Sequence, residues 1–253
     1  MNISLLPEIA WLALLVFARL GTLFVLMPGI GESSVPMRAR LVLALATLLV
    51  VYPSVSSVLP PVPTSALMML SMILREILIG LGIGLAVRFI LAVMQTAGTT
   101  IAFQMGLGFA LNVDPSQGTQ GVLLGNFLGL LGVTLIFLAD LHHLALVGIV
   151  QSYVLFGIND PIPIGDFTEF AVSSAAQAFS VAIQISAPFM VFGLIFYLGL
   201  GILSRLMPQL QIFMIAMPVN IVGGFLLLAA MLSALMTLYI DHVRTVLMQL
   251  LPL

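Results

Sequence analysis

Long apolar runs alternate with short stretches rich in proline and glycine along this chain of 253 residues. A helix that spans a membrane needs about 20 consecutive, mostly apolar residues. Clusters of turn-forming residues interrupt the pattern at 28–36, 53–63 and 158–166. The pattern predicts six helices, over residues 9–27, 41–59, 66–94, 122–156, 176–203 and 212–240.

The composition is typical of a membrane protein and not of a soluble one. Only 6% of the residues are charged and 62% are hydrophobic, with a mean hydropathy of +1.28. A soluble domain needs a much larger charged fraction on its surface. The net charge of −2 and the lack of a basic patch indicate no nucleic-acid partner, and the absence of cysteine excludes disulfides and thiolate chemistry. We therefore expect an all-α membrane protein with about six long apolar helices.

Charged residues inside the apolar runs need partners that their own helix cannot supply. Arg19, Arg75, Glu76 and Arg88 all lie within such runs, and a charge at a helix centre costs about 2.5–3.5 kcal/mol on insertion scales. Arg75 and Glu76 are adjacent, so they point about 100° apart and do not pair on one helix. These side chains can extend to the lipid interface, or they can meet other helices or other chains. We favour burial in a protein assembly for Arg75 and Glu76.

Glycine spacing also indicates close helix packing. Gly80 and Gly84 lie four residues apart, and Gly121, Gly125 and Gly129 continue the same spacing. Small residues at this interval let membrane helices approach each other closely. The pattern predicts tight packing and indicates no particular function.

The sequence offers no catalytic or metal-binding constellation. Asp140 and His143 would share one face of a helix while His142 points elsewhere, and two ligands do not complete a zinc site. The motif PIGD at 163–166 differs from the GxGD signature of intramembrane aspartyl proteases, because proline replaces its first glycine. We expect no catalytic residue, no metal and no cofactor.

Residues 105–121, MGLGFALNVDPSQGTQG, do not fit a membrane helix. Gly106 and Gly108 loosen the backbone, and Phe109, Leu111 and Val113 would share one face of an extended segment. Irregular backbone at membrane depth is tolerated only inside protein or beside a water-filled cavity.

The far end of this segment predicts a helix start, with Asp114 as the N-cap, Pro115 in the first turn and Gln117 completing a capping box. Two interpretations follow for the whole segment. It could be the broken-helix substrate site of a secondary transporter that works alone, or it could be a plug in a pore.

Three motifs resemble the FliR family, the export-gate proteins of the flagellar type III secretion system and their injectisome counterparts. They are QMGLGFALNVDP at 104–115, SRLMPQLQIFMIAMPVNI at 204–221 and VPMRARLVLAL at 35–45. The motifs favour the flagellar branch over the virulence injectisome. The family commonly has a glycine just before the histidines at 142 and 143, but this chain has Leu141 there. The departure argues against a helix break at that point.

The resemblance implies a fold and a set of partners. Residues 1–175 would form a FliP-like helical part that includes the 105–121 segment, and residues 176–253 a FliQ-like C-terminal hairpin. The chain would join several copies of FliP and FliQ, with FlhB and FlhA, in a helical hetero-oligomeric gate. That gate would lie in the bacterial inner membrane at the flagellar basal body and pass unfolded flagellar proteins.

The resemblance also implies roles for individual residues. Arg75 and Glu76 would meet neighbouring subunits, and the C-terminal motif would shape a hairpin turn and its subunit contacts. The implied plug comprises Gly106, Leu107, Gly108, Phe109, Ala110, Leu111, Asn112, Val113, Asp114 and Pro115. The implied interface or buried polar residues are Arg75, Glu76, Arg88, Arg205, Pro208, Gln209 and Asn220.

Overall fold

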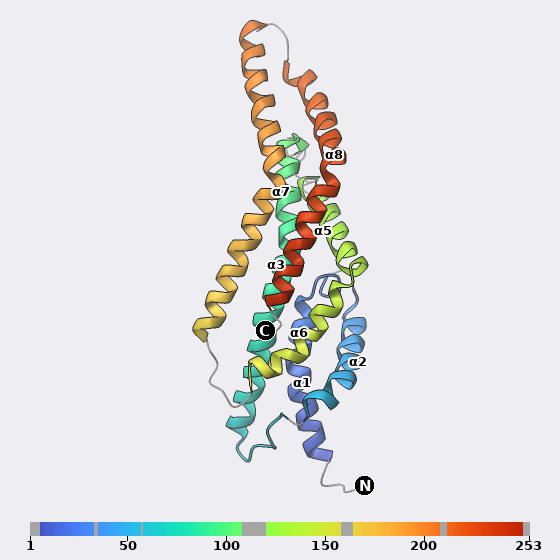
Figure 1. Cartoon of the computed structure of the whole chain (residues 1–253), viewed down its shortest axis with the longest axis vertical. Helices are drawn as coiled ribbons and strands as arrows, with labels where there is room; N and C mark the ends of the chain where they lie inside the picture. Colours follow the sequence, from blue (N-terminus) through green and yellow to red (C-terminus); the bar gives the residue numbers. More distant parts are fainter. Residues whose placement is uncertain are drawn as a thin grey trace. The chain divides into compact units, whose positions relative to one another are not determined.

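The structure, a computed structural model, describes residues 6–32, 35–56, 58–107, 120–157, 164–207 and 212–249. No strand occurs among those residues, and long helices dominate the chain (Figure 1). The helices are α1 (Leu6–Leu26), α2 (Met37–Val55), α3 (Ala66–Gln104), α5 (Gln120–Leu138), α6 (Leu141–Leu155), α7 (Ile164–Leu206) and α8 (Ile212–Gln249).

Five of these helices, α1, α2, α3, α7 and α8, are long and apolar enough to cross a membrane. The helices α5 and α6 form a bent pair, and counting that pair as one span gives six. The predicted class, an all-α membrane protein with about six long apolar helices, is confirmed.

The predicted end of the third run is wrong, because α3 continues beyond residue 94 to Gln104. Its last part is more polar than a lipid-facing helix, and the threonines there bond to their own helix. Thr99 Oγ1 donates to the carbonyl oxygen of Gln95 at 2.7 Å, and Thr100 Oγ1 to that of Thr96 at 2.9 Å. Threonine hydroxyls satisfied in this way can lie inside a helix.

Other helix ends also differ from the prediction. The helix α7 begins at Ile164 and not at 176, and α8 continues to Gln249 and not only to 240. The proline at position 53, predicted to open a break, lies inside α2. Hydropathy selects the most apolar part of a helix and omits the more polar turns at its ends, which explains the errors at α7 and α8.

The run predicted at 122–156 is two helices, contrary to the expectation that Leu141 argues against a break. Asp140 separates α5 from α6 and has a left-handed backbone conformation with φ 57°. Aspartate is one of the few side chains that enters this region at modest cost, because it is short and polar. The amide of Asp140 donates to Phe137 O at 3.2 Å, and the amide of His143 donates to Asp140 O at 3.1 Å. Asp140 therefore makes the turn that a glycine would otherwise make.

The chain divides into two compact units. Unit 1 comprises Met1–Ile90, Ile136–Ala175 and Val243–Leu253, and unit 2 comprises Leu91–Leu135 and Ala176–His242. In unit 1, α1 packs on α2 and α2 on α6. In unit 2, α3 approaches α5 so closely that a Cβ atom built on Gly98 would lie 2.6 Å from the Cα atom of Gly125. The helices α7 and α8 lie side by side in that unit, with Phe192 against Gly223.

Candidate functional site

A buried ionic network lies at the centre of unit 1. Arg19 of α1 and Glu76 of α3 are both fully buried. Arg19 Nε donates to Glu76 Oε2 at 2.7 Å and Arg19 Nη2 to Glu76 Oε1 at 3.0 Å, which is a bidentate pair. Arg19 Nη1 donates to Ser152 Oγ at 2.9 Å, and the guanidinium carbon lies 3.8 Å from the centre of the Tyr153 ring. One arginine thus joins α1, α3 and α6 through charge, hydrogen bonds and a cation–π contact.

A glycine makes this approach of α1 to α3 possible. A Cβ atom on Gly80 would collide with Thr22 Oγ1 and with the backbone oxygen of Arg19. One turn along, a Cβ atom on Gly84 would lie 2.8 Å from Leu26 Cδ1. The predicted spacing of Gly80 and Gly84 therefore corresponds to a close contact between helices, with α1 as the partner.

Arg75 and Arg88, the other two arginines predicted inside apolar runs, also have partners in unit 1. Arg88 Nη1 lies 2.7 Å from Glu32 Oε1, and these side chains are 37% and 30% exposed. Arg75 Nη2 donates to the carbonyl oxygen of Gly157. The contact of Glu76 with a neighbouring subunit, implied by the family resemblance, is not needed to satisfy its charge, because Arg19 of the same chain does so.

The irregular segment begins in unit 2, directly after α3. Gly106 has φ 79°, a conformation that favours glycine, and its amide donates to Phe103 O at 3.1 Å. Asn220 of α8 is 2% exposed, and its Nδ2 donates to the carbonyl oxygen of Gln104 at 3.1 Å. Asn220 therefore lies inside α8, against the end of α3, and not at the turn before α8.

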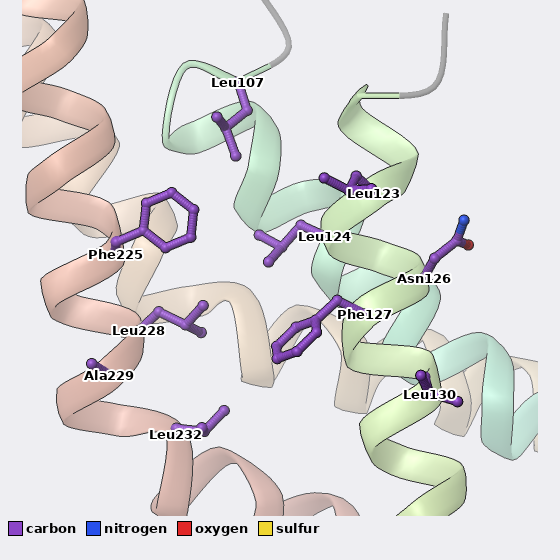
Figure 2. Close-up of a pocket in the computed structure, with 10 residues that line it drawn as sticks. All are labelled: Leu107, Leu123, Leu124, Asn126, Phe127, Leu130, Phe225, Leu228, Ala229 and Leu232. Atoms are coloured by element: carbon purple, nitrogen blue, oxygen red, sulfur yellow. The ribbon is translucent and has the colours of Figure 1, made fainter.

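A large apolar cavity adjoins the same region of unit 2. It measures about 890 Å³ and is bordered by α5, α8 and Leu107 (Figure 2). Ten residues line it: Leu107, Leu123, Leu124, Asn126, Phe127, Leu130, Phe225, Leu228, Ala229 and Leu232. Asn126 is the one polar member of that set. The lining suits apolar side chains or lipid chains, and it offers no charged group to a polar solute.

Most of the predicted plug lies outside the described residues. Gly106 and Leu107 are described, and Gly108, Phe109, Ala110, Leu111, Asn112, Val113, Asp114 and Pro115 are not. Pro208 and Gln209 also fall outside the described part of the chain. Arg205 lies in the last turn of α7, where a cation is favourable beside the negative end of the helix dipole.

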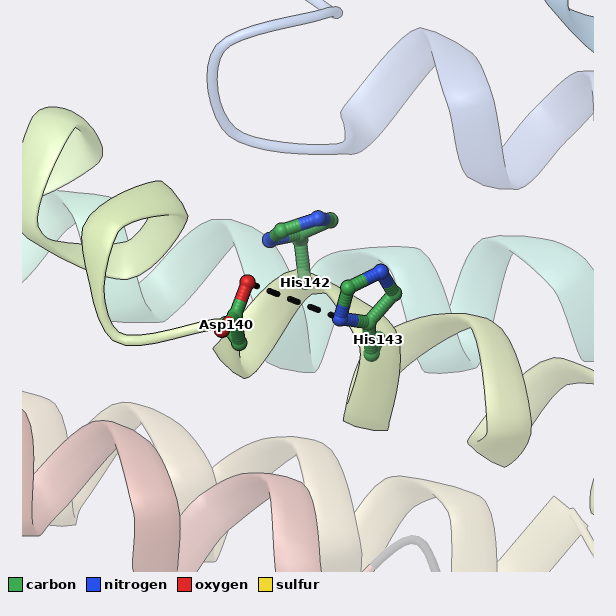
Figure 3. A group of neighbouring side chains, drawn as sticks. All are labelled: Asp140, His142 and His143. Atoms are coloured by element: carbon green, nitrogen blue, oxygen red, sulfur yellow. Dashed lines mark ion pairs between the residues drawn. The ribbon is translucent and has the colours of Figure 1, made fainter.

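Asp140, His142 and His143 lie close together where α6 begins (Figure 3). Their potential ligand atoms all lie within 4.8 Å of one another. His143 Nδ1 is 3.7 Å from Asp140 Oδ1, and both side chains are largely exposed. Three groups supply fewer than the four ligands of a closed zinc site. The expectation of no metal stays a prediction.

Sequence reasoning missed the three contacts that Arg19 makes with Glu76, Ser152 and Tyr153. It marked Arg19 and Glu76 as costly but did not pair them, since they lie 57 positions apart. It also missed Ser152 and Tyr153, which look like ordinary residues of an apolar run. A search for one buried cation and one buried anion on different helices would have suggested the pair of Arg19 and Glu76, because a buried charge without a partner is strongly destabilising.

Comparison with known proteins identifies the class of this membrane protein. Residues 10–246 match the model of the family described as "Bacterial export proteins, family 1". The match covers both units and nearly the whole chain. The chain therefore belongs to this family of export proteins.

Relatives of the chain include FliR proteins of flagellar biosynthesis. It is 38% identical over 237 residues to the flagellar biosynthetic protein FliR of Caulobacter vibrioides, covering 94% of both chains. It is 32% identical over 225 residues to FliR of Bacillus subtilis, covering 88% of this chain and 86% of the relative. A more distant similarity, 26% over 219 residues, connects it to the Yop proteins translocation protein T of Yersinia pestis, with 85% and 83% covered.

Proposed function

We propose that this protein is a subunit of the flagellar type III protein export gate. It helps to form and close the channel through which unfolded rod, hook and filament proteins cross the bacterial inner membrane. The observation that carries this proposal is the full-length similarity to FliR proteins, at 38% identity over 94% of the chain. The long apolar helices support a place in the membrane.

The channel would be closed by a plug segment, residues 106–115. Phe109, Leu111 and Val113 would exclude ions, and Asp114 and Pro115 would anchor the far end of the segment. Gly106 has a φ of 79°, a conformation that glycine adopts more readily than other residues, and this supports a hinge at the near end. The apolar cavity bordered by Leu107 supports an apolar environment at that end.

Partners and domain roles belong to the same proposal. Multiple copies of FliP and FliQ would surround this chain at the flagellar basal body, with FlhB and FlhA nearby. Residues 1–175 would correspond to the FliP-like part and residues 176–253 to the FliQ-like hairpin. Large apolar side chains on α7 are exposed, among them Leu194, Ile195 and Leu198. Such a surface fits either lipid or neighbouring apolar helices. The chain would do no chemistry, and the energy for export would come from other components.

Co-expression with FliP and FliQ of the same bacterium tests the assignment. An affinity tag on this chain is expected to recover one complex that contains both partners. The chain alone is expected to be poorly stable, because exposed apolar surface would then lack its neighbours. A chain that purifies without them as a small, stable oligomer and binds a polar solute would contradict the proposal and favour the secondary transporter.

The injectisome is a second candidate, favoured by the similarity to the Yersinia pestis translocation protein. The higher identity to FliR of Caulobacter vibrioides ranks the flagellum first. Loss of this chain is expected to abolish motility and the appearance of filament protein in the medium. A motile cell that has lost secretion of other proteins would favour the injectisome.

A further inference from the structure

The C-terminal end of α3 is held by a side chain of α8. The last carbonyl groups of a helix have no partner inside the helix, and Gln104 is the last residue of α3. Its carbonyl oxygen accepts a hydrogen bond from Asn220 Nδ2 at 3.1 Å, across 116 positions of sequence. Asn220 therefore caps a helix to which it does not belong.

The backbone that follows Gln104 lies close to the side-chain amide of Asn220. The amide of Met105 donates to Ile101 O at 2.9 Å, which completes the last helical turn. Gly106 then turns at φ 79°, and a Cβ atom there would lie 3.1 Å from Asn220 Nδ2. Glycine is thus favoured at 106 both by the backbone conformation and by the closeness of Asn220.

Two further glycines complete the contact with this helix end. A Cβ atom on Gly193 of α7 would collide with Gln104 Oε1, and one on Gly224 of α8 would collide with Met105 Cγ. Met105 is fully buried, so its side chain has little room to move away. Gln104 and Met105 thus lie in a cradle formed by Gly193, Gly224 and Asn220, and all of these residues belong to unit 2.

Packing alone does not explain an asparagine at position 220. Its Oδ1 atom is buried without a hydrogen-bond partner among the described residues. A small cavity of about 50 Å³ adjoins the side chain and is lined by Gly106, Tyr197 and Met217 among others. An apolar residue of similar size would fill this site without burying an unsatisfied oxygen. The feature that asparagine adds is the donor that holds Gln104.

We propose that Asn220 is a positioning residue, which fixes the point and direction at which the chain leaves α3. The plug segment begins at that point, so the consequence for the channel rests on the function proposed above. The cradle itself involves only described residues, namely Gly193, Asn220, Gly224 and the chain from Gln104 to Leu107, and it can be tested separately.

The mobility of the chain at Leu107 tests the proposal. The protein has no cysteine, so Leu107→Cys provides a single labelling site on this chain, which is spin-labelled before it is studied in the complex with FliP and FliQ. Adding Asn220→Leu, which keeps the branched shape and the number of heavy atoms of the side chain and removes the donor, is expected to shift the spectrum toward its mobile component. Gly199→Ala is the matched control, because a Cβ atom at Gly199 meets nothing within 4 Å. An unchanged spectrum in the assembled Asn220→Leu complex would overturn the proposal.

A second variant decides the outcome if Asn220→Leu does not assemble. Gly224→Ala is expected to displace Met105 and to mobilise the same label. The adjacent substitution Gly223→Ala meets Phe192 and not Met105, and it is expected to leave the label as ordered as in the parent. Equal spectra for Gly223→Ala and Gly224→Ala would contradict the cradle.

Ion leak across the membrane separates this proposal from the proposed function. Higher leak is expected from Asn220→Leu and also from deletion of residues 106–113. If neither change raises the leak while the label at 107 becomes mobile, the positioning role stands and the plug fails. If the deletion raises the leak while Asn220→Leu leaves the label ordered, the plug stands and the positioning role fails.

Discussion

The substitution Glu76→Gln is expected to lower the stability of the protein by about 3–5 kcal/mol, because it leaves the charge of Arg19 buried and uncompensated. Arg19 and Glu76 are both fully buried, and they form two hydrogen bonds with each other. Glutamine has nearly the size of glutamate, so lost packing would not explain the effect. The measurement is the thermal midpoint of the purified complex, together with the amount of this chain in membranes.

Two matched variants test whether the unpaired charge of Arg19 causes the loss of stability in Glu76→Gln. The double variant Arg19→Met, Glu76→Leu removes both charges, and it is expected to recover most of the loss, since apolar replacements of a buried ion pair are often tolerated. The variant Glu32→Gln breaks the half-exposed pair with Arg88, and it is expected to cost about 1 kcal/mol or less. Equal losses from Glu76→Gln and Glu32→Gln would contradict the structural role assigned to the buried network.

The substitution Gly98→Ala is expected to have the second large effect, at the upper end of about 1–3 kcal/mol, because the new methyl group meets backbone and not a flexible side chain. Its Cβ atom would lie 2.6 Å from Gly125 Cα, 2.9 Å from Gly125 N and 2.9 Å from Leu124 O. Relief would require α3 and α5 to separate. The thermal midpoint and the recovery of the complex with FliP and FliQ are the measurements.

The same substitution at a glycine in open space serves as the control. Gly199→Ala meets no atom within 4 Å, and alanine is favoured over glycine inside a helix by about 0.8–1.0 kcal/mol. Gly199→Ala is therefore expected to be neutral or stabilising. A Gly98→Ala protein as stable as Gly199→Ala would show that α3 and α5 do not approach closely at this point.

The apolar pattern predicted the helix centres well and the helix ends poorly. The runs at 9–27 and 41–59 lie close to α1 and α2. The end of α3 at Gln104 and the start of α7 at Ile164 were missed, because polar residues there are satisfied within the helix or by tertiary contacts. The break at Asp140 was missed because a non-glycine residue makes a left-handed turn there.

For the candidate sites, the sequence identified the residues that need partners but not the partners themselves. Insertion energies marked Arg19, Arg75, Glu76 and Arg88 as residues that need partners, and each has one on another segment. Local spacing could not identify those partners, since a pair separated by 57 positions leaves no periodic signal. Asn220 was predicted as an interface or buried polar residue because it lies in a family motif. Its contact with the end of α3 became visible only in three dimensions.

Deletion of Gly106–Val113 tests the central claim most directly. The deleted chain would be co-expressed with its partner proteins in cells that lack the native copy, and ion leak and secretion would be measured together. Recovery of the complex with FliP and FliQ shows that assembly survives. The account predicts that leak rises while flagellar proteins still leave the cell. Unchanged leak from an intact complex would contradict the role of this segment as the plug of an export channel.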